Sequence, residues 1–343
     1  MTSKELIKRV IHRDAPPRIG FNFKGDGQPS DIKFIDVTGV CVRDYHRYKK
    51  WGRYPELLAK TNNFSGEVCL YKEGNIYGRF EQKTNGECIK GVLQDGWELL
   101  ETYVFPEFDM ELEKSLLKYD YTASDKYLVS GLPFAVFAPL RDMRHMDNAL
   151  MDILLEPEYI KVLLDRLCEI NLEAIRRYAK RGTNAAMIWD DLGTQTSTFF
   201  SPTAFREIFK PYYKKLADEL HNNGMEFIVH SCGKTTALIP DFIEAGVDML
   251  QFDQPELHGV DVLAGYGDKI AFYCPVDIQK VMPTGDREFI EASALKMVES
   301  FKKSGGGLVA MDYGNWQDID VAPEWQQWAR DIIINNADRK SVV

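Results

Sequence analysis

The chain has 343 residues, of which 45% are hydrophobic and 27% are charged, and its formal net charge is −10. This composition is typical of a globular protein with a sizeable core. The acidic balance, with no Lys/Arg stripe along any predicted helix, makes nucleic acid an unexpected partner. No apolar stretch reaches the ~20 residues of a membrane helix and the N-terminus lacks a signal-peptide core, so we expect a cytoplasmic protein with no membrane partner.

In chain order, the first expected elements are a helix over residues 1–15, a strand over 18–23, a glycine-rich loop over 24–30 and a strand over 31–37. The pattern changes between about residues 40 and 110. Residues 68–80 there predict a β-hairpin with its turn at Glu73-Gly74-Asn75. We interpret this stretch as an insertion that decorates the fold.

The remaining chain alternates between apolar strands and amphipathic helices, which is typical of repeated βα units. The expected strands are 134–138, 185–191, 226–230, 247–253, 270–274 and 307–311, and the expected helices include 148–180, 202–222 and 287–304. Such a series predicts an α/β fold, a (β/α)8 TIM barrel with an inserted N-terminal β-hairpin region, and we expect residues 1–343 to form one domain. The active site of such a barrel lies at the carboxyl ends of its strands.

Two metal donors stand where one buried strand ends, His230 and Cys232. Alternate strand residues point to the same side, so both can reach one ion. A catalytic zinc usually takes three protein ligands, and Cys274, at the end of another strand, is the best candidate for the third. The alternative is that Cys274 is a small buried hydrophobe.

Other polar residues follow the expected strands and would share this rim. Asp190 and Asp191 are candidates for acid/base catalysis or for holding a metal ligand, although one of them could instead cap the following loop. The candidate substrate-binding residues are Asn22, Gln195 and Tyr313. Further rim residues are Asp253, Asp312 and Asn315.

The chain resembles the uroporphyrinogen decarboxylase superfamily, a barrel family, in several motifs that occur in the same order. They are 190–195 (DDLGTQ), 200–212 (FSPTAFREIFKPY), 230–233 (HSCG), 238–248 (LIPDFIEAGVD) and the glycines at 305–307. True decarboxylases of this superfamily carry an Arg-Gln-Ala-Gly-Arg-Tyr segment after the first strand, whose arginines hold the substrate carboxylates. This chain has Phe21-Asn-Phe-Lys-Gly-Asp-Gly27 there, so porphyrinogen decarboxylation is disfavoured.

The other branch of the superfamily consists of zinc-dependent, cobalamin-linked methyltransferases, whose His-x-Cys zinc motif matches His230 and Cys232. Their thiol-methylating members usually carry a cysteine near the last strand, where this chain has Met311-Asp-Tyr-Gly314. The resemblance therefore implies that Cys274, or an acidic residue such as Asp190, supplies the third ligand.

The resemblance implies a demethylase that moves a methyl group from a small methylated substrate to the cob(I)alamin of a partner corrinoid protein. The preferred substrate is a methoxylated aromatic, and Tyr77, Phe80 and Trp97 of the insertion could hold its ring. Methylamines, betaines and thiols remain open as other methyl donors. The alternatives are a decarboxylase of a porphyrinogen or another carboxylate, a thiol-methylating cobalamin methyltransferase, and a non-catalytic protein that binds a corrinoid or tetrapyrrole.

Overall fold

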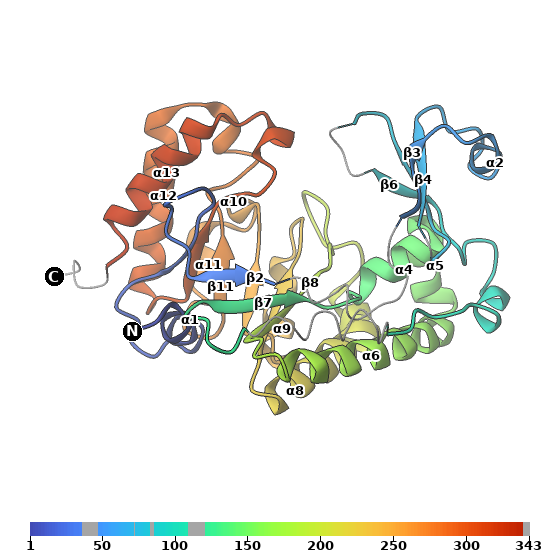
Figure 1. The fold of residues 1–343 in the computed structure, drawn as a ribbon, viewed down its shortest axis with the longest axis horizontal. Helices are drawn as coiled ribbons and strands as arrows, with labels where there is room; N and C mark the ends of the chain where they lie inside the picture. Colours follow the sequence, from blue (N-terminus) through green and yellow to red (C-terminus); the bar gives the residue numbers. More distant parts are fainter. Residues whose placement is uncertain (36–46, 72, 83–85, 109–120, 339–343) are drawn as a thin grey trace.

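The fold is a parallel barrel whose eight strands run in the order β1-β12-β11-β10-β9-β8-β7-β2. The computed structural model describes residues 1–35, 47–71, 73–82, 86–108 and 121–338 (Figure 1). The barrel strands are β1 (Gly20–Asn22), β2 (Ile32–Phe34), β7 (Tyr127–Gly131), β8 (Ala185–Trp189), β9 (Glu226–His230), β10 (Met249–Gln251), β11 (Ala271–Cys274) and β12 (Leu308–Met311). This architecture confirms the predicted TIM barrel.

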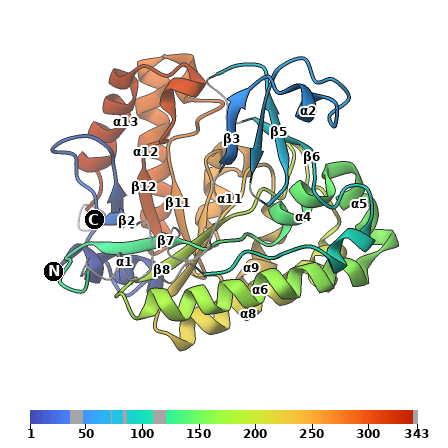
Figure 2. The same cartoon turned by 45° about the vertical axis from the view of Figure 1, so that its right-hand side comes forward.

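Helices cover the outside of the barrel. They are α4 (Phe137–Arg144), α5 (Met146–Leu155), α6 (Pro157–Ala179), α7 (Pro202–Ala204), α8 (Lys210–Asn222), α9 (Ile239–Ala245), α10 (Pro255–His258), α11 (Val260–Ala264), α12 (Arg287–Lys303) and α13 (Pro323–Asn335). Helices α6 and α8 lie side by side along one flank (Figure 2). The short turns are η2 (Trp97–Glu101), η3 (Phe205–Phe209), η4 (Thr236–Leu238), η5 (Met282–Thr284) and η6 (Trp316–Ile319). Among the described residues, no helix is both long and apolar enough to cross a bilayer.

The strands alternate between two cores, as the period of a β-strand requires. In β11, Ala271 and Tyr273 belong to the cluster inside the barrel, whereas Phe272 and Cys274 belong to the cluster between barrel and helices. Helix α1 (Ser3–His12) packs its buried residues into the inner cluster and closes the amino end of the strands. The carboxyl ends remain available for a site.

Strands β1 and β2 meet through Asp31 rather than through a regular ladder. The Asp31 backbone N–H donates to the Phe21 carbonyl over 2.7 Å, and the Phe21 N–H donates to the Asp31 carboxylate over 2.9 Å. Arg18 forms an ion pair with the same carboxylate at 2.8 Å. One aspartate therefore joins the two ends of the sheet.

The inserted region forms a second, antiparallel sheet of β3 (Arg47–Gly52), β4 (Glu67–Tyr71), β5 (Ile76–Arg79) and β6 (Glu87–Lys90), with the short helix α2 (Pro55–Leu58). It stands above α4 and α5, across a gap from α12 and α13 (Figure 1). The hairpin predicted at 68–80 is β4–β5, and β3 and β6 were not predicted. The end of the strand expected at 31–37, and residues 40–46 of the expected insertion, lie outside the described residues.

Two predicted elements are wrong. The apolar run 134–138 is not a strand, because the carboxylate of Asp190 binds the backbone N–H groups of Val136, Phe137 and Ala138 and turns the run into the start of α4. The strand is the preceding β7. The single helix expected over 148–180 is split between α5 and α6, where Pro157 starts the new helix and cannot continue the old one.

Candidate metal centre

The site begins where β8 and β9 end side by side, with Trp189 in register with His230. The loops that follow approach each other closely at Gly233, whose φ is +81°. A Cβ there would lie 2.1 Å from the Gly193 carbonyl oxygen, so only glycine fits. The Cys232 backbone N–H donates to the Asp191 carboxylate over 2.8 Å, which ties the two loops together.

Asp191, His230 and Cys232 direct their donor atoms at one point. All three atoms lie within 4.8 Å of one another. The His230 Nε2 lies 3.3 Å from the Asp191 Oδ1 and 3.4 Å from the Cys232 Sγ. Zinc bonds at tetrahedral angles place neighbouring ligand atoms roughly 3.3–3.7 Å apart, so the donor types and the spacing both fit zinc.

Gln251, on the neighbouring strand β10, sets the orientation of the His230 ring. Its amide oxygen can only accept, so the hydrogen bond between them places the hydrogen on the His230 Nδ1 and leaves the Nε2 lone pair for a metal. The Gln251 amide nitrogen in turn donates to the Asp253 carboxylate over 2.7 Å. Sequence reasoning missed Gln251, although a polar residue inside the apolar run 247–253 was the available signal.

The electrostatics of the cluster favour a cation. Burial acts to raise the pKa of the Asp191 carboxyl, but the hydrogen bond and charge of His230, together with the Cys232 N–H and Arg141, outweigh it and lower that pKa to about 2. Burial acts to lower the pKa of the His230 imidazole, yet its hydrogen bonds to Asp191 and Cys232 raise the pKa well above the usual range. In the metal-free protein, Asp191 and Cys232 stabilise a proton on His230. The same three side chains would bind a metal ion once that proton is lost.

Asp190 has a different environment from its neighbour. It is fully buried and accepts hydrogen bonds from three backbone N–H groups at the start of α4 and from the Tyr213 hydroxyl. Burial raises the pKa of its carboxyl. Asp190 therefore positions α4, and of the two predicted catalytic carboxylates the structure brings only Asp191 to the cluster.

Cys274 does not join the cluster either. Its side chain is fully buried in the outer hydrophobic layer, while the inward position of β11 is taken by Tyr273. The strand period explains the difference, because Tyr273 is in register with Gln251 and Gln251 with His230. Burial raises the pKa of the Cys274 thiol to about 12, as for a small hydrophobe. The third donor in the structure is Asp191.

The three residues predicted to bind substrate are dispersed. Asn22 lies at the end of β1, donates to the Tyr273 hydroxyl and accepts from Ser30 over 2.8 Å. Tyr313 is half-buried, and burial, with Asp253 and Cys232 adding to it, raises the pKa of its phenol. Gln195 is exposed in the turn after β8.

The remaining rim residues also differ in their surroundings. Asp312 is held by Arg330 at 2.8 Å and accepts the Lys24 N–H, which is a structural role, and Asn315 is exposed. The structure thus leaves Asp253, bonded to Gln251, as the one of these three that extends the cluster.

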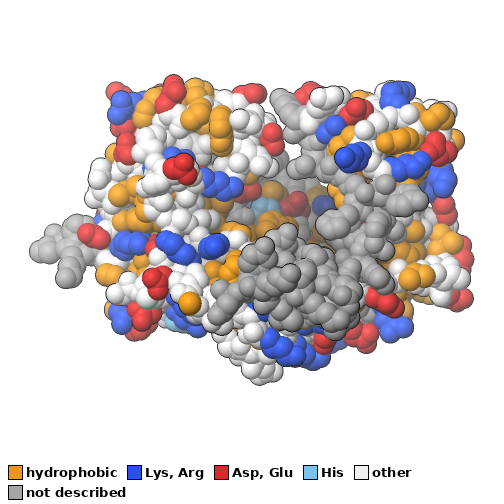
Figure 3. Space-filling view, in the orientation of Figure 1, with side chains coloured by type: hydrophobic (Ala, Val, Ile, Leu, Met, Phe, Trp, Pro, Cys, Tyr) orange, Lys and Arg blue, Asp and Glu red, His pale blue; other side chains and the backbone are white. Residues whose placement is uncertain are grey.

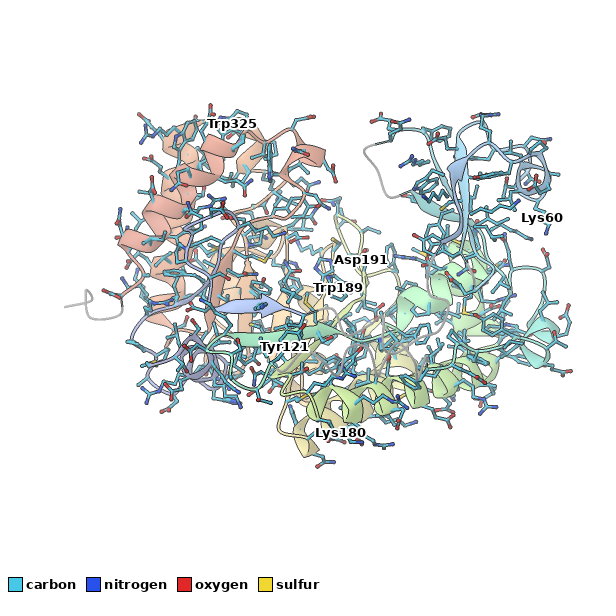
Figure 4. All side chains as sticks on the ribbon, viewed as in Figure 1. Lys60, Tyr121, Lys180, Trp189, Asp191 and Trp325 are labelled. Carbon is cyan, nitrogen blue, oxygen red and sulfur yellow. The ribbon has the colours of Figure 1, made fainter. Side chains whose placement is uncertain are left out.

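A cavity of about 160 Å³ lies between the barrel mouth and the inserted sheet. Its lining includes Trp189, which is 48% exposed, and Tyr77 of the predicted aromatic set. Trp97 is buried and stacks on Tyr159, and Phe80 is 76% exposed, and neither lines the cavity. Trp189 and Asp191 lie together below the gap between the two parts of the molecule (Figure 4). At the bottom of this hollow a histidine, an acidic and a basic side chain reach the surface (Figure 3).

Comparison with known proteins identifies the family of this chain. The model of the uroporphyrinogen decarboxylase family matches residues 129–312. The chain belongs to this family. Uroporphyrinogen decarboxylases of Vibrio vulnificus (strain YJ016) and Aliivibrio fischeri (strain MJ11) are each 25% identical over 201 residues, which is 58% of this chain and 52% of theirs. The chain thus matches about half the length of these curated relatives.

A solved structure shares the fold over almost the whole chain. A methyltransferase from Methanosarcina mazei superposes with a TM-score of 0.57, covering 97% of this chain and 99% of its own, at 14% sequence identity. At this identity the likeness shows that the two proteins share a fold.

Proposed function

We propose that this protein is a zinc-dependent methyltransferase that moves a methyl group from a small methylated substrate to the cob(I)alamin of a partner corrinoid protein. The observation that carries the proposal is that the donor atoms of Asp191, His230 and Cys232 lie within 4.8 Å of one another, with the His230 Nε2 at zinc-like spacing from the other two. The resemblance of the His-x-Cys motif to the methyltransferase branch of the family supports it, as does the shared fold with a methyltransferase.

Zinc in this cluster would supply Lewis acidity to an ether oxygen, because three protein ligands leave one position open. Asp191, His230 and Cys232 hold the ion, and Gln251 fixes the ring of His230. Asp190 keeps α4 against the mouth, so that the Arg141 side chain lies near Asp191 and lowers its pKa further. Each residue thus binds or orients; none forms a bond with the substrate.

The substrate that we favour remains a methoxylated aromatic compound. In this reaction the C–O bond would break with both electrons staying on oxygen, the methyl group would go to the cob(I)alamin of the partner, which would supply the electron pair of the new bond, and the phenolate would take a proton from solvent. Figure 3 shows a hollow between the inserted sheet and the last helices, and we propose that the corrinoid protein approaches the mouth there.

Decarboxylation of a porphyrinogen is the second candidate, because the curated relatives carry that name. Two observations count against it. The arginine-containing segment is replaced by Phe21–Gly27, and the cavity has Glu73 and Asp142 in its wall, which suits the charge of a tetrapyrrole polycarboxylate poorly.

The test is metal analysis together with a turnover assay. Purified protein should contain about one zinc per chain, and with 2-methoxyphenol and cob(I)alamin it should form methylcobalamin and catechol. Conversion of uroporphyrinogen to coproporphyrinogen by the same preparation would overturn the proposal in favour of the second candidate.

A further inference from the structure

The cavity beside the metal centre combines aromatic and acidic walls. We call it the aromatic–acidic pocket and define it by six of its lining residues: Glu73, Tyr77, Tyr103, Phe134, Asp142 and Trp189. They come from the turn and the second strand (β5) of the inserted hairpin, from the segment after η2, from the segment before α4, from α4 itself and from the end of β8. The pocket therefore exists only because the inserted sheet covers this side of the barrel.

Trp189 connects the pocket to the metal centre. It lines the pocket, its Cα is in register with that of His230, and it occupies an inward position in line with Met187 of the inner core. Its indole is 48% exposed in a strand that is otherwise buried. A flat ring that stacks on Trp189 would lie next to the side chains that hold the metal.

The volume is sufficient for a single aromatic ring. An apolar cavity of about 150 Å³ holds one benzene molecule, and this pocket measures about 160 Å³. Tyr77, Tyr103 and Phe134 supply the apolar walls that such a ring requires.

The two acids of the pocket differ in their partners. Asp142 accepts from the Tyr77 hydroxyl over 2.6 Å and from the Arg141 Nε over 2.9 Å. The Glu73 Oε2 is buried and has no hydrogen-bond partner among the described residues. Burial, with Asp142 adding to it, raises the pKa of the Glu73 carboxyl to about 7. A buried carboxyl oxygen of this kind needs a ligand donor to satisfy it.

We propose that the aromatic–acidic pocket binds the methyl donor, and that this donor is an uncharged, hydroxylated methoxybenzene whose phenolic O–H donates to Glu73. Binding of a ring that carries a carboxylate is disfavoured, because its charge would face Glu73 and Asp142, and no lysine or arginine is among the described residues that line the pocket. This inference rests on the proposed methyl transfer, for which it names the class of donor.

The experiment is calorimetric titration of the zinc-loaded protein with four one-ring probes: 2-methoxyphenol, methoxybenzene, 4-hydroxy-3-methoxybenzoate and trimethylanilinium. We expect 2-methoxyphenol to bind at least about tenfold more tightly than each of the others. The Glu73→Gln variant should lose most of the discrimination against the benzoate. Glu87→Gln, an exposed carboxylate on β6 of the same sheet, is the matched control and should bind as the wild type does.

Equal or tighter binding of the benzoate by the wild type would overturn the inference. So would tighter binding of trimethylanilinium, which would make the pocket a cage for cations. The same probes are then tested for methyl transfer to cob(I)alamin. If 2-methoxyphenol binds through Glu73 without any methyl transfer, the pocket assignment stands and the proposed function fails. If methyl groups are transferred from donors whose affinity is the same in the wild type and in Glu73→Gln, the proposed function stands and the pocket assignment fails.

Discussion

Strand β9 has an ionisable residue at each end, and the two ends are built differently. Glu226, at its start, accepts from the Tyr127 hydroxyl over 2.8 Å, pairs with His12 at 3.1 Å and has Lys8 at 3.7 Å. His230, at its end, lies with the Asp191 and Cys232 donor atoms around one point. Glu226 is already paired with basic side chains of the protein, whereas the donor atoms around His230 are arranged to bind a cation from outside.

The difference shows which end of the barrel serves stability and which serves chemistry. At the floor, α1 brings Lys8 and His12 to Glu226 and closes the inner core. At the mouth, strand ends and loops leave side chains that need a ligand, as barrel enzymes generally do. Variants at the two ends should therefore differ in whether they change zinc affinity or the free energy of unfolding.

The largest expected effect is at the mouth. His230→Ala or Cys232→Ala should weaken zinc binding by more than about 100-fold, roughly 3 kcal/mol, because two protein donors replace three. Competition with a metallochromic chelator measures the affinity. Thermal unfolding of the zinc-free proteins is the control, and a variant that keeps wild-type zinc affinity would contradict the assignment.

At the floor, Glu226→Ala should lower the free energy of unfolding by about 2 kcal/mol, because the fully buried Tyr127 hydroxyl loses its acceptor. Urea denaturation measures this change. Zinc affinity should stay at the wild-type value, since Glu226 lies at the other end of β9 from His230. A loss of zinc affinity with an unchanged free energy of unfolding would contradict the structural role of Glu226.

A smaller effect is expected from Gln251→Ala, which removes the acceptor of the His230 Nδ1–H. Zinc affinity should fall by about tenfold, roughly 1.4 kcal/mol, because the ring orientation is no longer fixed. Gln251→Glu keeps an acceptor there and should retain most of the affinity. Equal losses in both variants would mean that Gln251 only packs.

The smallest effect concerns Glu73, whose folded pKa of about 7 lies above its ordinary value of 4.5. The folded protein then binds this proton more tightly than the unfolded chain, so its stability falls as pH rises from about 4.5 to about 7 and is level above. Glu73→Gln should lack this fall, so its stability relative to the wild type should rise across that window. The facing groups are Asp142, Arg141, Tyr77, Tyr103 and Cys88, and a difference independent of pH would show that Glu73 is not buried as described.

The barrel and two of the three metal donors could be predicted from the sequence, because both depend on local patterns. Apolar runs before His230 and Asp190 give the strands, and parallel strands bring their ends to one rim. The choice between Asp190 and Asp191 could not be made, since it depends on which side chain meets the start of α4. That start is itself part of an apolar run, 134–138, which local pattern assigns to a strand.

Cys274 shows the limit of reasoning from strand ends. A strand end fixes the height of a residue in the barrel, but its inward or outward direction depends on register with β10, which the sequence does not display. Gln251 and Trp189 were missed for a related reason. Their importance follows from the strand that pairs with each, and from the inserted sheet that completes the pocket around Trp189.

Zinc K-edge X-ray absorption of the purified protein tests the central claim most directly. One sulfur ligand at about 2.3 Å with nitrogen and oxygen ligands at about 2.0–2.1 Å is the expected spectrum, and it should be unchanged in Cys274→Ala and lose its sulfur shell in Cys232→Ala. Two sulfur ligands in the wild type, or a sulfur shell that disappears with Cys274, would contradict the assignment of Asp191, His230 and Cys232.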